Sequence, residues 1–146
     1  MAKITNLPEF ELLNDAGEPV NILELKGSSK LVLYFYPENE SWICTKEACA
    51  FRDQYHIFTQ LGAKVIGINK ALPAGLNSFK QNHRLPFMLL SDPDFKIHKL
   101  FGINNFLGFS GRETFLFDEK GMLVFSYNSL LSASGHINKT LDALKR

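Results

Sequence analysis

Two short runs of the chain are apolar almost without interruption, and an amphipathic stretch lies between them. Residues 31–36, Leu-Val-Leu-Tyr-Phe-Tyr, are all apolar or aromatic, and residues 64–69, Lys-Val-Ile-Gly-Ile-Asn, come close to the same pattern. Such runs are typical of strands that are buried on both faces of a sheet. Between them, apolar residues recur at helical spacing: Cys44, Ala48, Phe51, Tyr55 and Phe58. This spacing predicts one helix over residues 44–61, and hence a strand, helix, strand unit with parallel strands.

Turn residues predict a hairpin on each side of this unit. Near the N-terminus, Asn-Asp-Ala-Gly predicts a β-hairpin with strands over residues 10–13 and 20–22. Later in the chain, Asp-Glu-Lys-Gly at 118–121 predicts an antiparallel hairpin with strands over residues 114–117 and 122–125. The N-terminal hairpin is expected as an extension of the main sheet.

The remaining pattern completes an α/β fold. The other predicted elements are a short helix over 76–83, a strand over 87–90, a helical turn over 95–101 and a C-terminal helix from about 134. Parallel strands come first, and a hairpin and a helix come last. This order is typical of a thioredoxin-like fold, with a central mixed sheet flanked by helices.

Composition places these elements in one globular domain. The 146 residues are 45% hydrophobic and 21% charged, and they contain no internal repeat or linker, so we expect a single domain over residues 1–146. With 16 basic and 15 acidic side chains, the formal charge of +1 does not favour a nucleic acid or an acidic membrane as partner. No membrane span or signal peptide is recognisable, and we expect a cytoplasmic protein.

The two cysteines are the candidate chemistry of the chain. Cys44 comes where the buried strand has ended and the long helix begins. A helix N-terminus favours a thiolate over a thiol, because its backbone N–H groups are unpaired and its dipole is positive there. A cysteine at such a place can act as a nucleophile at neutral pH. Cys49 follows five residues later, which is too far for the Cys-x-x-Cys pattern of a thioredoxin-type reductase.

The same pair has other interpretations. Two buried cysteines can simply be small hydrophobic residues of the core. A zinc site would need two further ligands, and the histidines have no paired spacing, so no metal is expected: His56, His83, His98 and His136. A metal chaperone that uses the cysteines is a third possibility at this stage.

The sequence around the cysteines is similar to a known active site. Tyr-Phe-Tyr-Pro at 34–37, followed by Cys-Thr-Lys-Glu-Ala-Cys-Ala-Phe-Arg-Asp at 44–53, strongly resembles the active-site segment of peroxiredoxin Q, also called bacterioferritin comigratory protein. Further blocks resemble that family in the same order along the chain: residues 8–10, 64–68, 85–87, 90–94 and 112–116. The resemblance therefore extends over almost the whole chain.

The resemblance implies a thiol peroxidase that needs no cofactor. Such an enzyme reduces hydrogen peroxide or organic hydroperoxides and is recycled by thioredoxin or a similar dithiol reductant. It implies that Cys44 attacks the peroxide and that Cys49 resolves the product through an intramolecular disulfide. Pro37, Ser41 and Cys44 match the family pattern Pro-x-x-x-Thr/Ser-x-x-Cys, and Arg112 corresponds to the catalytic arginine. The family expectation is a monomer, with a dimer left open.

These residue types suit peroxide chemistry independently of the family. When a thiolate attacks one peroxide oxygen, the departing oxygen gathers negative charge that donors can stabilise. Arg112 can supply a permanent cation and several N–H groups, and the Ser41 hydroxyl can donate to the peroxide. Pro37 can shield the site without offering a competing N–H group. Glu47, one turn into the helix, could hold Arg112 in place by a charge-assisted hydrogen bond.

One feature departs from the family pattern. The residues before Cys44 are Trp42 and Ile43, where peroxiredoxin Q proteins usually have Pro-Gly. Bulky apolar side chains narrow the choice of loop conformations compared with glycine. The alternative function is therefore a non-catalytic thioredoxin-like redox sensor or binding protein in which these two side chains form a contact patch.

Overall fold

The structure is a computed structural model that describes residues 4–27, 29–36, 42–103, 105–106, 109–110, 112–128 and 133–145. Its helices are α1 (Trp42–Asp53), α2 (Tyr55–Gln60), α3 (Pro73–His83), α4 (Lys96–Leu100) and α5 (Ala133–Leu144), with a 3-10 turn η1 (Ile22–Leu25). Its strands are β1 (Glu11–Asn14), β2 (Pro19–Asn21), β3 (Lys30–Phe35), β4 (Ala63–Asn69), β5 (Met88–Ser91), β6 (Asn105–Phe106), β7 (Phe109–Ser110), β8 (Glu113–Phe117) and β9 (Leu123–Asn128).

Seven strands form one mixed sheet in the order β2-β1-β5-β4-β3-β8-β9. The three central neighbours β3, β4 and β5 are parallel, and the remaining pairs are antiparallel. The predicted α/β class, the parallel pair and both hairpins are thus confirmed. Strands β6 and β7 form a separate two-stranded sheet that the sequence patterns did not predict.

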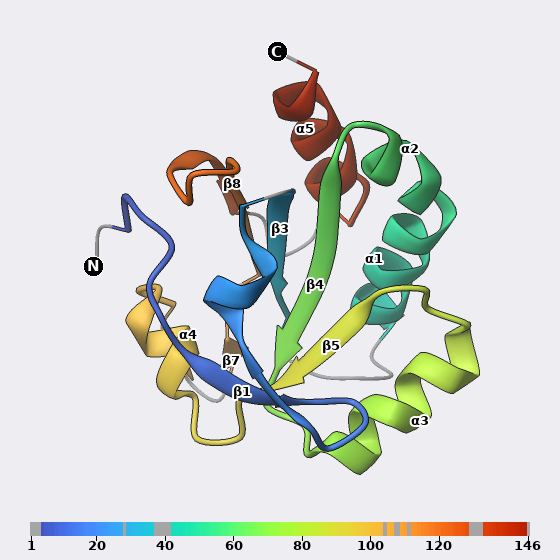
Figure 1. Cartoon of the computed structure of the whole chain (residues 1–146). Coiled ribbons are helices and arrows are strands. Elements are labelled where there is room, and N and C mark those ends of the chain that lie inside the picture. The colour runs from blue at the N-terminus through green and yellow to red at the C-terminus, as the bar shows by residue number, and fades with distance from the viewer. Residues whose placement is uncertain are drawn as a thin grey trace.

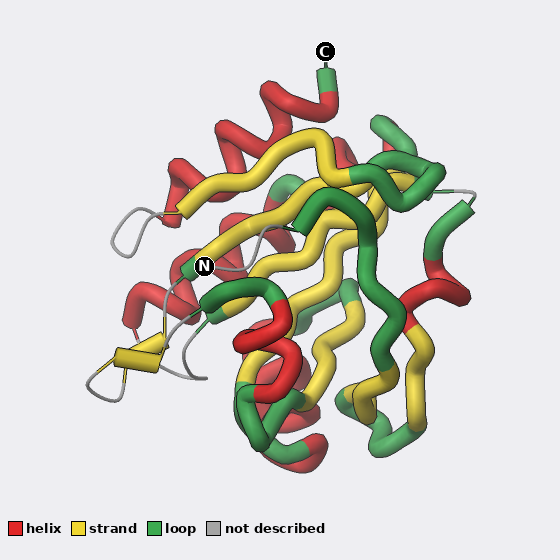
Figure 2. Tube along the Cα trace, turned by 90° about the vertical axis from the view of Figure 1, so that its left-hand side faces the viewer, coloured by secondary structure: helices red, strands yellow, loops and turns green. Residues whose placement is uncertain are grey.

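The sheet divides the core into two layers. Along β3, Val32 and Tyr34 pack on one face, together with buried residues of α1, α2, α3 and α5. The intervening Leu33 and Phe35 pack on the other face, with the N-terminal segment, η1 and α4. Because both faces of β3 are covered, its residues from 31 to 35 are fully buried, as the apolar run predicts. Figure 1 shows α1 and α2 on one side of the sheet and α4 on the other, and Figure 2 shows α4 in front of the strands.

Two helices differ from their predicted bounds. The apolar stripe predicted one helix over residues 44–61, whereas the structure has α1 and α2 with Gln54 between them. Gln54 has φ −104° and ψ 5°, outside the helical region, so the second helix begins anew after it. Helix α3 begins at Pro73, three residues before the prediction, since proline suits the first position of a helix.

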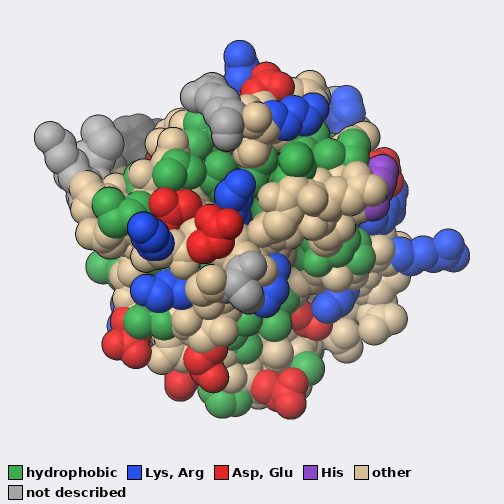
Figure 3. All heavy atoms as spheres, turned by 45° about the horizontal axis from the view of Figure 1, so that its top comes forward, with side chains coloured by type: hydrophobic (Ala, Val, Ile, Leu, Met, Phe, Trp, Pro, Cys, Tyr) green, Lys and Arg blue, Asp and Glu red, His purple; other side chains and the backbone are tan. Residues whose placement is uncertain are grey.

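The surface has no strong bias in charge on the face presented in Figure 3. Lys and Arg side chains are interspersed there with Asp and Glu side chains. Within the described residues, no helix is long and apolar enough to cross a membrane. The cytoplasmic location stays a prediction.

Gly67 allows β4 to pass closely under two core side chains. A Cβ atom at this position would lie 2.8 Å from Cδ2 of Leu89 and 2.9 Å from the ring of Tyr34. Gly67→Ala should therefore lower the free energy of unfolding by about 1–3 kcal/mol, the usual effect of overpacking a core. Urea unfolding of the two proteins measures this difference. An unchanged free energy would show that Leu89 and Tyr34 can move aside without cost.

Candidate active site

The N-terminus of α1 and the start of β8 lie at the same edge of the sheet. Cys44 is in the first turn of α1, which follows the carboxyl end of β3. Strand β8 runs antiparallel to β3, and Phe35 at the end of β3 pairs with Glu113 at the start of β8. Arg112 directly precedes Glu113, so the register brings it to the edge where α1 begins.

The structure describes the backbone of Cys44; Pro37 and Ser41 lie outside the described residues.

Glu47 and Arg112 meet inside the protein. Nη1 of Arg112 donates to Oε1 of Glu47 over 3.4 Å, a long hydrogen bond from a guanidinium to a carboxyl group. Glu47 is fully buried and Arg112 is 4% exposed. Burial raises the pKa of the Glu47 carboxyl from 4.5 to about 8, although the charge and the hydrogen bond of Arg112 act in the opposite direction. The contact that the sequence suggested between these residues is present.

His136 joins this pair from α5. Its Nδ1 lies 3.5 Å from Oε2 of Glu47 and 2.7 Å from Oγ1 of Thr114, and its ring packs edge-on against Tyr127. His136 and Thr114 are fully buried. The sequence did not indicate a role for His136 beyond a rejected zinc ligand, because nothing in its spacing relates it to Glu47, which lies 89 positions earlier. A histidine at the start of an amphipathic helix was the only available signal.

Cys49 lies further along α1 than Cys44. It is half-buried and its thiol is free. Beyond it, Arg52 connects α1 to α3, because Nη1 of Arg52 donates to the backbone oxygen of His83 over 2.7 Å. Nε of Arg52 also pairs with Asp53 at 3.0 Å. The end of α1 is thus held in place, whereas the cysteines occupy its first two turns.

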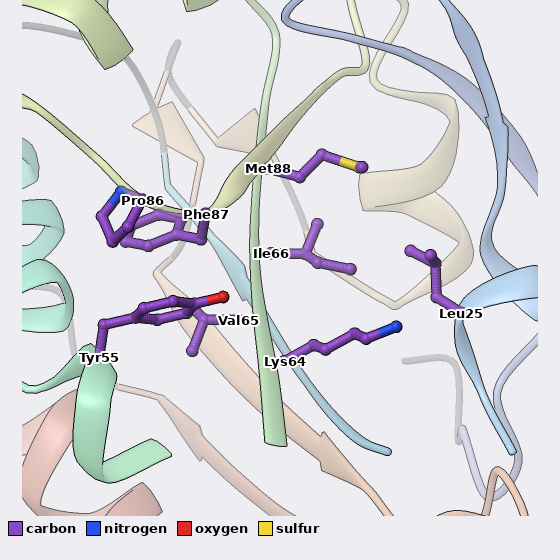
Figure 4. A pocket seen from close by; sticks show the side chains of 8 residues that line it. All are labelled: Leu25, Tyr55, Lys64, Val65, Ile66, Pro86, Phe87 and Met88. Carbon is purple, nitrogen blue, oxygen red and sulfur yellow. The ribbon is translucent and has the colours of Figure 1, made fainter. Parts of the chain in front are cut away.

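A cavity of about 230 Å³ lies in another part of the molecule. Its lining comes from η1, α2, the first half of β4 and the segment leading into β5: Leu25, Tyr55, Lys64, Val65, Ile66, Pro86, Phe87 and Met88. Figure 4 shows that the Tyr55 side chain points toward β4 in this cavity. Because α1 begins beyond the opposite ends of these parallel strands, the cavity is separate from the cysteine site. No cluster of three or more metal-binding side chains occurs among the described residues.

Comparison with known proteins identifies the family. The AhpC/TSA family profile matches residues 5–126. A Populus jackii protein named "Peroxiredoxin Q, chloroplastic" is 40% identical over 140 residues, which cover 94% of this chain and 65% of the poplar protein. The structure of peroxidoxin BcpB from Mycobacterium tuberculosis has a TM-score of 0.90 and 30% identity, over 96% of this chain and 94% of that one. The structure of bacterioferritin comigratory protein from Xanthomonas campestris has a TM-score of 0.85 and 25% identity, over 97% of this chain and 98% of that one.

The chain therefore belongs to the AhpC/TSA family and, within it, to the peroxiredoxin Q group. This confirms the family and the thioredoxin-like fold that the sequence motifs implied. Peroxiredoxins are thiol-dependent peroxidases of the oxidoreductase class. The chain spans about two thirds of the length of the poplar relative, 65%.

The buried carboxyl predicts a specific dependence of stability on pH. The pKa of Glu47 is about 8 in the folded chain and near 4.5 when the side chain is exposed. Between these values the folded state holds a proton that the unfolded state has lost, so the free energy of unfolding should decrease as the pH rises from about 4.5 to about 8. Glu47→Gln should remove more than about 1 kcal/mol of this decrease, the equivalent of one pKa unit.

Urea unfolding at several pH values measures the effect. Glu119→Gln is the matched control, because Glu119 is exposed and its replacement should leave the pH dependence unchanged. The same slope in the wild type and in Glu47→Gln would show that the Glu47 carboxyl is already ionised in the folded protein.

Proposed function

We propose that this chain reduces hydroperoxides with Cys44 as the attacking residue and Arg112 as the principal donor to the reacting atoms. The observation that carries the proposal is the position of Cys44 in the first turn of α1, at the sheet edge where Arg112 is held by Glu47. We also assign Pro37 and Ser41 to the function because they match the family pattern in the sequence. Membership of the peroxiredoxin Q group supports the same assignment.

The first chemical step converts the Cys44 thiolate to a sulfenic acid. The sulfur attacks the terminal oxygen of the hydroperoxide, the O–O bond breaks and an S–O bond forms. The departing alkoxide or hydroxide takes up a proton and leaves as an alcohol or water. The positive end of the helix dipole at the start of α1 favours the thiolate, and the Arg112 guanidinium favours both the thiolate and the developing negative charge on oxygen.

The second step forms a disulfide between Cys44 and Cys49. The Cys49 sulfur attacks the sulfenic acid sulfur, and water leaves. Both cysteines lie in α1, and residues five apart in a helix are about 8–9 Å apart at Cα, from its rise and radius. A disulfide requires less than about 7 Å. The first turns of α1 therefore have to unwind before the bond can form, and unwinding exposes the disulfide to a reductant.

The substrate and the reductant follow from the same chemistry. We propose hydrogen peroxide and organic hydroperoxides as substrates, since the Xanthomonas campestris protein is described as having alkyl peroxide reduction activity. A dithiol such as thioredoxin would reduce the disulfide by thiol exchange and restore both cysteines. No cofactor is required, because the electrons come from the two thiols.

Substitution of Cys44 and Arg112 tests the peroxidase assignment. Cys44→Ser should abolish peroxide consumption coupled to thioredoxin, thioredoxin reductase and NADPH, because a hydroxyl without a base is a poor nucleophile. Arg112→Ala should lower the rate about 100-fold, the usual scale for losing one transition-state donor. If the wild type consumed no peroxide in this assay, the redox-sensor alternative would be the better account. An unchanged rate in Arg112→Ala would mean that another group stabilises the leaving oxygen.

Substitution of Cys49 tests the resolving step. Cys49→Ser should consume about one equivalent of peroxide and then stop, because Cys44 still forms the sulfenic acid but no internal thiol condenses with it. In the wild type, oxidation should increase hydrogen exchange over residues 44–52 and leave β4 protected. Full thioredoxin-linked turnover by Cys49→Ser would assign a one-cysteine mechanism. Equal protection of residues 44–52 in both redox states, with the disulfide confirmed by mass, would rule out unwinding.

A further inference from the structure

The two oxygens of the Glu47 carboxyl have different neighbours. Oε1 accepts a hydrogen bond from Arg112. Oε2 makes no hydrogen bond to a described residue, and it lies 3.5 Å from Nδ1 of His136. The same Nδ1 lies 2.7 Å from Oγ1 of Thr114. One imidazole nitrogen therefore faces a carboxyl oxygen and a hydroxyl oxygen in a site without solvent.

The position of one proton decides whether this arrangement is favourable. If Nδ1 carries a lone pair, it repels an ionised Oε2 but suits a protonated carboxyl. If Nδ1 carries a hydrogen and the ring is an imidazolium, it suits the Glu47 carboxylate. These two arrangements contain the same number of protons and differ only in which residue holds one of them. A carboxyl and an imidazole at this distance would share that proton and titrate as a unit.

The proton count of this pair sets the net charge of Glu47, His136 and Arg112, about one helical turn along α1 from Cys44. Arg112 is positively charged at every relevant pH. With the proton present, Glu47, His136 and Arg112 together carry one positive charge. After the proton leaves, the Glu47 carboxylate and Arg112 cancel each other. In a buried site, this change removes the positive field that favours a thiolate and a developing oxyanion.

We propose that His136 is a positioning residue of the peroxide site, which shares one proton with Glu47 and thereby keeps the charge of Arg112 available to the reacting sulfur and oxygen. The inference rests on the proposed role of Arg112 in peroxide reduction. His136 does not contact the reacting atoms; it acts through the protonation of Glu47.

The other titratable groups near this pair are few among the described residues. From β9, Tyr127 contacts the His136 ring. The rings of Tyr34 in β3 and of Tyr36, which follows β3, belong to the same buried layer as α1. Glu113 is next to Arg112, and its Oε1 accepts a hydrogen bond from Nδ2 of Asn128. The other ionisable residues of the two helices are Cys44, Lys46, Cys49, Arg52 and Asp53 on α1, and Lys139 and Asp142 on α5.

A direct titration tests the shared proton without using activity. Infrared difference spectra follow the protonated carboxyl of Glu47 as the pH is raised, with Glu47→Gln identifying the band. The midpoint should fall by about one pH unit in His136→Gln, a tenfold loss of proton affinity. The side-chain amide in His136→Gln cannot take up the shared proton, and its N–H group stabilises the ionised Glu47 carboxylate. His56→Gln is the matched control, since His56 is exposed and on α2, and it should leave the midpoint unchanged.

The wild-type protein provides a second measurement if His136→Gln does not fold. The 15N chemical shifts of the His136 ring should change with the same midpoint as the infrared band, because coupled groups report a common macroscopic titration. Ring shifts that stay constant while the carboxyl loses its proton would overturn the inference, and so would an unchanged infrared midpoint in folded His136→Gln.

The rate of peroxide consumption by the reduced enzyme then tests the positioning role. In the wild type, the rate should decrease above the midpoint of the pair, and in His136→Gln this decrease should move to lower pH by the same shift as the infrared band. Glu47→Gln should lose the decrease, and adding His136→Gln to it should have no further effect on the pH profile. A residue that only supports the fold would lower the rate equally at every pH and add to Glu47→Gln, which would contradict the proposal. If Cys44→Ser remained active, the proposed function would fail while the titration result stood.

Discussion

A fully buried carboxyl group is the constraint on which the arrangement of this site depends. Glu47 has no access to solvent, and its neighbours come from the residue before β8 and from α5. An uncompensated charge in such a place is costly, so the carboxyl either keeps its proton or requires both partners. α1, the residue before β8 and α5 therefore have to lie close together for Glu47 to have both of these neighbours.

The sheet brings Arg112 and Thr114 close to Glu47 and His136, because the register between β3 and β8 fixes where these distant parts of the chain lie. Tyr34 on β3 pairs with Thr114 on β8, so the hydroxyl that contacts His136 lies on the same face of the sheet as the α1 and α5 layer. Two residues earlier on the β8 side, Arg112 reaches the edge where α1 starts. Shifting the register by one residue would turn Thr114 to the opposite face and separate the cluster.

The sequence indicated those features that depend on local patterns. The apolar run of β3 and the turn residues of the hairpins carry their signals within a few neighbouring positions, and these elements appear as expected. The Glu47–Arg112 contact was accessible because the family resemblance assigned Arg112 to the site, where a nearby carboxyl of opposite charge suggests a pair. His136 was not accessible, because its relation to Glu47 exists only after α5 has packed on α1. The break at Gln54 was missed for a related reason, since the apolar stripe continues across it and periodicity does not report a change in backbone angles.

The location of Glu47 between the two cysteines connects the buried charge to the proposed disulfide chemistry. Cys44 and Cys49 cannot approach each other while the helix between them is intact, and Glu47 is part of that segment. Unwinding it would withdraw the carboxyl from Arg112 and His136 and return it to water, where its pKa falls toward the ordinary value. The folded helix bears the free-energy cost of burying the Glu47 carboxyl away from water. Unwinding would remove this cost, which offsets part of the packing energy lost at Ala48 and its neighbours. Farther along, Phe51 and the Arg52 contact with His83 hold the end of α1 against the core. The contacts that hold the end of α1 therefore lie immediately beyond Cys49.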